Sequence, residues 1–358
     1  MSKALSIFPA ILAVTLLVAC SSGSSGPSSP QTPDVETVDL TADEAEFVDQ
    51  SGRVDDYSQT RIACEARGWT KSTIAVTIGQ RRYLRKVLYS APASATWRGA
   101  VIVMHGGGGN YAQWCSAGFT SRGMMTDAML DNDFAVFLLD STDITTDESG
   151  ALCGKVWDDN VLARDNHDVP YITSVITEVI ADLRPAGSPS NIFLTGFSSG
   201  GFMATRAATE LNHLVTGFIP MGTASPYGWH RDCSFLTIRD LVAGVGQDND
   251  SNLNISEINA CGPTELNPLA SYPSEVAWLD GGATVKPHYL KIQHFDDAIV
   301  DFSCHTRHVH QLEQNGYAGS LFELRPTGGT RSLIHHNVIA EFITPMIDYL
   351  LASTSSPR

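Results

Sequence analysis

Basic residues are scarce in this 358-residue chain, which has 23 Lys and Arg against 39 Asp and Glu and a formal net charge of -16 at pH 7. Nucleic-acid phosphates would be repelled by such a balance, so we exclude DNA and RNA as partners. We expect instead a neutral or cationic small partner, or a polymer without phosphate groups.

Charged residues are also few, at 17%, while 43% of the residues are hydrophobic. A chain of this length and composition can bury a sizeable core, and we expect one large α/β domain with extensions; two smaller domains are the alternative. The sequence has no internal repeat.

The N-terminus "MSKALSIFPAILAVTLLVAC" is typical of a secretory signal, with Lys3 before an apolar stretch that ends at Ala19. The residues Leu17 to Cys20 resemble the bacterial lipobox. That resemblance implies cleavage before Cys20 and acylation of Cys20, and Ser21 in place of Asp implies anchoring to the outer membrane. An ordinary signal peptide with a chance cysteine is the alternative.

The segment after Cys20 is poor in apolar residues. "SSGSSGPSSPQTP" is too polar and flexible to pack, and the acidic stretch that follows to Asp56 is expected to be a solvated extension, or a tail that binds cations. The expected organisation is a signal peptide over residues 1–19, a tether over 20–56 and a catalytic domain over 57–358.

Paired cysteine motifs are missing. Once Cys20 is lipidated, an even set of cysteines is left in an exported chain, which predicts up to three disulfides. The expected pairs are Cys115–Cys153 and Cys233–Cys261, although spacing alone does not choose among the pairings. A metal site is the weaker interpretation of the remaining cluster Cys304, His305, His308 and His310, because it has one thiol and no paired motif.

From Thr73 onward, runs typical of strands alternate with runs typical of helices. The expected strands include a hairpin over "TIAVTI" and "RRYLRKVLYS", then "AVIVMH", "FAVFLLD", "NIFLTG", "VTGFIPMG", "HYLKIQHF" and "SLFELR". The expected helices are "YITSVITEVIADL", "FMATRAATEL", "HTRHVHQLEQNG" and "VIAEFITPMIDYLLAS". This alternation predicts a mostly parallel, doubly wound sheet with helices on both faces.

Gly196, Ser198 and Gly200 form G-x-S-x-G between an expected strand and an expected helix. In that context the pattern is typical of a nucleophile elbow, in which a sharp turn lifts the serine hydroxyl above the sheet. The helix N-terminus behind the serine favours developing negative charge. Without this placement the pattern would indicate only a Gly/Ser-rich turn.

Four glycines, Gly106 to Gly109, follow His105 at the end of another expected strand. This stretch looks like the HGGG-type loop that supplies one oxyanion-hole N–H in α/β hydrolases. Gly106 and Gly107 are the preferred candidates for that N–H, and Ser199 is expected to supply the other. The stretch lacks a following G-K-[ST], which argues against a phosphate-binding loop. His105 is expected to fix this loop instead of acting as a base.

Four segments together resemble the exported polyhydroxybutyrate depolymerase and feruloyl or acetylxylan esterase group of α/β hydrolases: "RRYLRKVLYSAP", "VIVMHGGGGNYAQWC", "DVPYITSVITEVI" and "NIFLTGFSSGGFMATRAA". The resemblance covers residues 73 to 351 and implies the α/β-hydrolase fold. It departs from the group at Asn166 and His167, where paired aspartates are frequent, at Ser199, where asparagine is frequent, and at "TRSLIHH", which replaces a second glycine-rich stretch.

A serine nucleophile needs a base and an acid, which follow it in the order acid, then histidine, in this fold. Asp297 is preferred as the acid because Ala298 to Val300 complete a segment that resembles D-x-x-V in α/β hydrolases; Asp296 and Asp301 are the alternatives. His336 is preferred over His335 because the residues after it resemble the step into the final helix of such enzymes.

The expected reaction is two-step hydrolysis of carboxylic esters, polymer-derived or of plant-wall type, without a cofactor. A serine peptidase on the same fold and a binding lipoprotein without turnover are the alternatives. Tyr111, Trp114 and Trp157 are candidates for an aromatic wall at the substrate. No separate module follows the last expected helix, so we expect soluble oligomers or side-chain esters as substrates instead of crystalline polymer.

The region "GQDNDSNLNISEINACG" has oxygen ligands at the spacing of a calcium loop, at Asp248, Asp250 and Asn252. Leu253 replaces the usual glycine and Asn259 the usual bidentate glutamate, so the preferred interpretation is an acidic loop that lies over the sheet as a lid or substrate wall, without a metal.

Overall fold

The computed structural model describes residues 36–39, 47–48, 54–55, 64–107, 109–115, 120–141, 143–146, 152–157, 166–226, 280–297, 300, 302–325 and 336–355. Among these residues, no helix combines the length and the apolar composition needed to cross a bilayer. The expected lipidation site Cys20, the calcium candidates Asp248, Asp250 and Asn252, and the expected pair Cys233–Cys261 lie outside the described residues.

The centre of the molecule is a nine-stranded sheet in the order β1-β5-β7-β6-β10-β11-β12-β13, with β4 paired to β5. Its strands are β1 (Glu36–Asp39), β4 (Thr70–Ile78), β5 (Arg81–Ser90), β6 (Gly99–Met104), β7 (Phe134–Leu139), β10 (Ile192–Phe197), β11 (Gly217–Met221), β12 (His288–His294) and β13 (Gly319–Leu324). The β4–β5 and β5–β7 pairs are antiparallel, and the others are parallel. This confirms the predicted mostly parallel sheet.

The helices are α2 (Thr120–Asp131), α3 (Asp168–Ser174), α4 (Ala181–Leu183), α5 (Ser199–Glu210), α9 (Phe302–Gln314) and α10 (Ile343–Ser355). A π-helical segment, η2 (Val175–Ile180), joins α3 to α4, and short 3-10 helices form η1 (Tyr111–Trp114) and η6 (Ala340–Phe342). Two small antiparallel pairs, β2 (Phe47–Val48) with β3 (Val54–Asp55) and β8 (Asp143–Thr146) with β9 (Leu152–Val156), complete the described elements.

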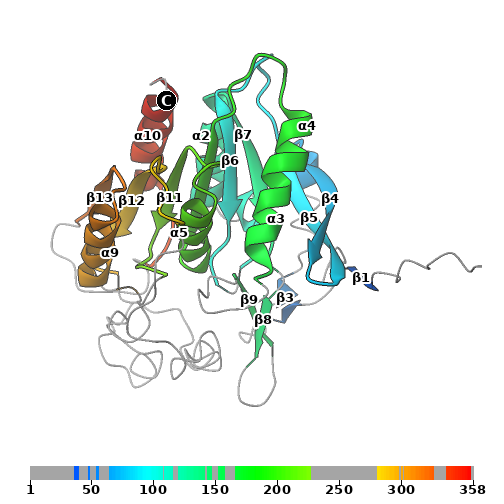
Figure 1. Ribbon diagram of the computed structural model, residues 1–358, viewed down its shortest axis with the longest axis horizontal. Helices are drawn as coiled ribbons and strands as arrows, with labels where there is room; N and C mark the ends of the chain where they lie inside the picture. Colours follow the sequence, from blue (N-terminus) through cyan, green and yellow to red (C-terminus); the bar gives the residue numbers. More distant parts are fainter. Residues whose placement is uncertain are drawn as a thin grey trace, which may run out of the picture. The chain divides into compact units, whose positions relative to one another are not determined.

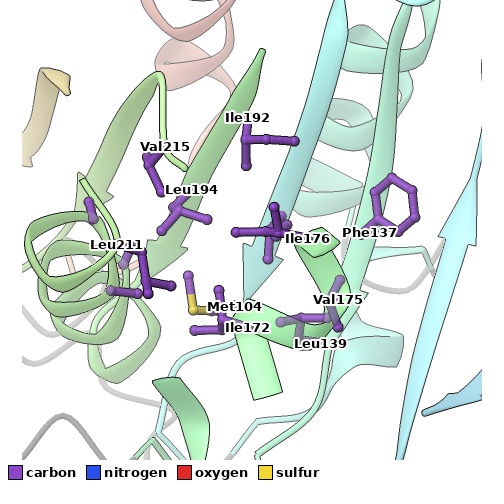
Figure 2. Packing of buried hydrophobic residues seen from close by; sticks show 14 of the residues in the cluster. Met104, Phe137, Leu139, Ile172, Val175, Ile176, Ile192, Leu194, Leu211 and Val215 are labelled. Carbon is purple, nitrogen blue, oxygen red and sulfur yellow. The ribbon is translucent and has the colours of Figure 1, made fainter. Parts of the chain in front are cut away.

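The central strands are apolar throughout because both faces of the sheet are covered. Along β6, Ala100, Ile102 and Met104 belong to one buried cluster, while Val101 and Val103 belong to the other. The first cluster includes residues of α3, η2 and α5, and the second includes residues of α2 and α10. Figure 1 shows α3, α5 and α9 in front of the sheet, and Figure 2 shows Ile172, Val175 and Ile176 packed beside Met104 and Leu139.

Each strand and helix predicted from Thr73 onward is found in the sheet and the helices above. The sequence analysis named no helix for α2, whose buried apolar residues Met125 and Met129 are too few to give a clear helical pattern. It also placed Glu36–Asp39 in the tether, whereas the compact unit begins at Glu36 and β1 pairs in parallel with Arg81–Leu84 of β5.

The structure corrects one expected disulfide. Cys64 and Cys115 form a disulfide with a Cα–Cα distance of 5.3 Å, so Cys115 is not available to Cys153. The reason lies in the packing of the segment before β4 against η1: Arg67 Nη1 donates to the Cys115 carbonyl, and Arg67 Nη2 donates to Asp127 of α2. The expected partner Cys153 is nearer in the sequence, but the folded chain brings the more distant Cys64 to Cys115.

Candidate functional site

The turn between β10 and α5 places Ser198 in a conformation that L-residues rarely adopt. Its φ is 51° and its ψ is -122°, and its N–H donates to the Met221 carbonyl of β11 at 2.9 Å. Among the described residues, only Asp133 shares a positive φ without being glycine. A serine held this way, at the end of a strand and directly before a helix, has the geometry of a nucleophile elbow.

The glycines of G-x-S-x-G are required by close backbone approach. A Cβ added at Gly196 would lie 2.4 Å from the Gly200 carbonyl carbon, and one added at Gly200 would lie 2.3 Å from the Met104 carbonyl oxygen. Neither contact can be relieved by a side-chain movement, because the neighbouring atoms belong to the backbone. The pattern therefore reflects how tightly α5 begins against β10 and β6.

The structure brings Ser198 together with His336 and Asp297. The Ser198 hydroxyl lies 3.0 Å from His336 Nε2, and His336 Nδ1 lies 2.8 Å from Asp297 Oδ2. The three residues come from separate places in the chain: the end of β10, the turn after β12 and the segment before η6. The Asp297 side chain is 1% exposed and that of His336 is 13% exposed, so the line runs from a buried acid towards solvent.

The alternatives named from the sequence are placed differently. Asp296 is 8% exposed, and its backbone N–H donates to His294 Nδ1 at 3.2 Å. Asp301 and His335 lie outside the described residues. The contact with His336 is therefore made by Asp297, the carboxylate that sequence reasoning preferred.

The Asp297 carboxylate is held by donors on both oxygens. Val300 N–H donates to Oδ1 at 3.0 Å, and Gln293 Nε2 donates to Oδ2 at 3.0 Å. Gln293 was missed by the sequence analysis. The sequence feature that could have indicated it is a polar residue inside a predicted strand otherwise suited to burial, and Gln293 is fully buried.

His105 fixes the glycine-rich loop that follows β6. The Ser141 backbone N–H donates to His105 Nε2 at 3.1 Å, so the ring proton is on Nδ1, which donates to the Gly106 carbonyl at 2.8 Å. The ring is fully buried, 3.4 Å from the Asp140 carboxylate. Both ring nitrogens are engaged in hydrogen bonds to the backbone, so His105 holds the loop in place, as expected from the sequence.

The loop passes close to Ser198. A Cβ added at Gly106 would lie 3.7 Å from Ser198 Cβ, and Gly109 N–H donates back to the Gly106 carbonyl at 3.0 Å, which tightens the turn. Ser199 is the first residue of α5, so its N–H has no acceptor within the helix. Gly106 therefore lies close to Ser198, and the first N–H of α5 is available to a ligand, while Gly108 lies outside the described residues.

Trp157 links the two sides of this arrangement. Its backbone N–H donates to Ser199 Oγ at 3.0 Å, and its indole N–H donates to the His105 carbonyl at 2.8 Å. Trp157 is 2% exposed, Tyr111 7% and Trp114 0%. This burial speaks against the expected aromatic wall: Trp157 packs in the cluster that includes α3 and α5, and Tyr111 and Trp114 pack in the cluster that includes α2 and α10, so the three rings offer little apolar surface to a substrate.

A network of buried charges lies behind the loop. Arg85 of β5 donates to Asp168 at 2.8 Å and to the Asp140 carbonyl at 2.7 Å, and Lys86 lies 3.3 Å from the Asp140 carboxylate. Each of these charges has an opposite partner, as buried ions require. The network fixes the end of β7 and the start of α3 relative to β5.

Two other buried sites contain basic side chains, one at Arg122 and one around Lys291. Arg122 of α2 donates to Asn337 Oδ1 at 3.0 Å beside His336, and burial lowers its pKa to about 10, so it stays charged at neutral pH. Lys291 of β12 donates to the Thr223 hydroxyl at 2.9 Å, and burial lowers its pKa well below the usual value. Burial and the nearby Lys291 likewise lower the pKa of His305 and of His308 on α9.

Within the part of the chain that the structure describes, no group of three or more His, Cys, Asp or Glu side chains is arranged to hold a metal ion. His305 Nδ1 instead donates to the Thr223 carbonyl at 3.0 Å. The side chain of Cys304 lies outside the described residues.

No family model matches the chain, and no curated protein matches its sequence. Among solved structures, a Pyrococcus furiosus esterase aligns with a TM-score of 0.50 and 13% identity, over 81% of this chain and 92% of that one. A Pyrococcus horikoshii acylaminoacyl peptidase aligns with a TM-score of 0.49 and 14% identity, over 81% of this chain and 42% of the peptidase. A truncated carbohydrate esterase from gut microbiota aligns with a TM-score of 0.47 and 13% identity, over 80% and 97%.

Proposed function

We propose that this chain, which has the α/β-hydrolase fold, is a serine esterase that hydrolyses carboxylic esters through an acyl-enzyme. The observation that carries the proposal is the hydrogen-bonded line from Ser198 to His336 to Asp297, which begins at a strained elbow. A serine hydroxyl is a weak nucleophile until a base takes its proton, and this line supplies the base and the group that orients it.

The geometry suggests a role for each group. Ser198 Oγ attacks the ester carbonyl while its proton passes to His336 Nε2, and Asp297 Oδ2, which accepts from Nδ1–H, stabilises the imidazolium. The Ser199 N–H and one N–H from Gly106 or Gly107 stabilise the oxyanion, each by about a hundredfold or more in rate. His336 then returns the proton to the leaving alcohol.

Deacylation repeats these steps with water. His336 Nε2 accepts a proton from the attacking water, the resulting oxyanion uses the same N–H groups, and collapse of the intermediate releases the acid and returns the proton to Ser198 Oγ. No cofactor takes part in this scheme.

The substrate class rests on sequence. The glycine-rich loop and the elbow resemble those of exported polyhydroxybutyrate depolymerases and feruloyl or acetylxylan esterases, so polymer-derived or plant-wall esters are the proposed substrates. The net charge of -16 favours neutral or cationic esters over phosphorylated ones. We also propose that the chain is exported, cleaved before Cys20 and lipid-anchored at the bacterial outer membrane. Metabolic labelling with an alkyne fatty acid should mark the chain and spare Cys20→Ser.

The test uses the full chain, purified in detergent, with p-nitrophenyl acetate, p-nitrophenyl butyrate, a feruloyl ester and a peptide p-nitroanilide. We expect hydrolysis of at least one ester and a fall in kcat/KM of about a thousandfold or more in Ser198→Ala. Ser94→Ala, which changes a half-buried serine whose hydroxyl donates to the nearby Thr96 carbonyl, is the matched control and should match the wild type. Turnover of the peptide alone would support a peptidase, and equal activity of Ser198→Ala would remove Ser198 as the nucleophile.

A further inference from the structure

Strand β12 carries polar side chains where a buried strand normally has none. Its residues alternate between the two faces of the sheet: Leu290 and Ile292 belong to the cluster that includes α10, whereas Tyr289 belongs to the opposite cluster. Lys291 and Gln293 share the face of Tyr289, on the side of the sheet where α9 packs, and both are fully buried. Burial of an amide costs free energy unless its hydrogen bonds are satisfied, so the partners of Gln293 are informative.

Gln293 is bonded to the candidate acid and to its turn. Its Nε2 donates to Asp297 Oδ2 at 3.0 Å and to the Val300 carbonyl at 3.1 Å. Asp297 Oδ2 is also the oxygen that accepts from His336 Nδ1, while Oδ1 accepts from Val300 N–H. One side chain on a rigid strand thus spans both ends of the turn that presents the carboxylate.

We propose that Gln293 is a positioning residue for the triad, one that holds Asp297 Oδ2 on His336 Nδ1 and shares the negative charge which that oxygen offers to the imidazolium. The inference rests on the proposed function. Gln293 touches neither substrate nor the reacting atoms, and it acts through Asp297. A second contact comes from its own turn, where Val300 N–H donates to Oδ1, whereas the Gln293 amide connects Oδ2 to strand β12 of the sheet.

Two substitutions separate positioning from packing. Gln293→Met keeps the length and removes the donor, so the Asp297 carboxylate loses a charge-assisted hydrogen bond; we expect kcat to fall by about tenfold to a hundredfold, with KM within about twofold. Gln293→Glu keeps the shape of the side chain but lets it donate a hydrogen bond only when the carboxyl group is protonated. A protonated Glu can donate to Asp297 Oδ2, whereas an ionised Glu places a second negative charge beside it.

The measurement is kcat and KM from pH 5.5 to 8.5 for the full chain in detergent, with the ester that the wild type hydrolyses best. The deficit of Gln293→Glu relative to wild type should grow about tenfold or more as pH rises, while that of Gln293→Met should not grow with pH. Gln311→Met on α9 is the matched control and should behave as wild type. The ionisable side chains around this strand are those of Asp297, His336, Lys291, His305 and His308, so each variant is compared with wild type at the same pH.

The outcomes are distinct. Wild-type kinetics in both Gln293 variants, with Ser198→Ala inactive, would overturn the positioning role and leave the esterase proposal intact. A deficit in Gln293→Glu that is the same at every pH would assign Gln293 a packing role and overturn the inference as well. Full activity of Ser198→Ala would instead remove the proposed function. If Gln293→Met does not fold, as judged by thermal unfolding, the pH dependence of Gln293→Glu decides alone.

Discussion

Gly200 illustrates how a single residue sets the geometry of the candidate site. Its position places the start of α5 against the end of β6, where an added Cβ would lie 2.3 Å from the Met104 carbonyl oxygen and 2.4 Å from that of His105. The same two residues lead into the glycine-rich loop. The turn at Ser198 and the glycine-rich loop are therefore held together by a close backbone contact that only glycine allows.

We expect Gly200→Ala to destabilise the protein by about 3 kcal/mol or more, because the backbone of β6 and of the loop would have to move. Urea unfolding measures the change. Gly316→Ala is the matched control: Gly316 has a φ of 77° but no atom within 4 Å of an added Cβ, so only about 1 kcal/mol of backbone strain is expected. Equal losses in the two variants would mean that β6 yields to the methyl group.

At the scale of elements, the packing of α9 against β12 brings three buried basic side chains together. Lys291 comes from β12, His305 and His308 come from α9, and all three are fully buried. Burial lowers the pKa of each, and the positive charge of Lys291 adds to the effect on both histidines. In the unfolded chain these histidines would bind protons below about pH 6.5, whereas in the folded chain they stay neutral to lower pH.

The sign of the pH dependence follows. Below about pH 6.5 the unfolded state binds more protons than the folded state, so the free energy of unfolding should fall as pH drops from 7.5 towards the lowered folded pKa. His308→Leu removes one of these groups and should flatten that dependence. The measurement is the free energy of unfolding in urea at a series of pH values.

His310→Leu, which changes an exposed histidine of the same helix, is the control for His308→Leu and should leave the pH dependence close to that of wild type. If His308→Leu and wild type lose stability equally on acidification, His308 is not the group that resists protonation, and the acid sensitivity belongs to other residues.

At the scale of the molecule, the Cys64–Cys115 disulfide connects the segment before β4 to η1, across 51 residues of sequence. Both cysteines are fully buried, and Cys115 lies at the end of the segment that follows the glycine-rich loop. The bond therefore restrains the segment before β4 relative to η1, and it is compatible with the proposed export to an oxidising compartment.

We expect the double variant Cys64→Ala and Cys115→Ala to lose about 2–4 kcal/mol of stability, because the unfolded chain regains the freedom that the bond removes. Thermal unfolding with and without dithiothreitol measures this. Reductant should lower the Tm of the wild type and leave that of the double variant nearly unchanged. A double variant as stable as the oxidised wild type would contradict a stabilising role for the bond.

Local residue patterns were enough to predict most of the strands and helices from Thr73 onward, although not α2, β8 or β9. Apolar runs such as "AVIVMH" indicated strands buried on both faces, and G-x-S-x-G at a strand-to-helix junction indicated where Ser198 would turn. These features depend on neighbours within a few residues. The preference for Asp297 and His336 came instead from a resemblance to segments of other α/β hydrolases and from the expected chain order of serine, acid and histidine.

Only the tertiary structure decided which distant residues meet. It paired Cys64 with Cys115, brought Gln293 to Asp297, buried the rings of Tyr111, Trp114 and Trp157 in the core, and added β1 to β5. Such contacts join residues far apart in the chain, and neither composition nor spacing encodes them. The sequence by itself determined the elements and the serine turn because backbone sterics and apolar periodicity are local; the support around the triad was decided by packing across the sheet.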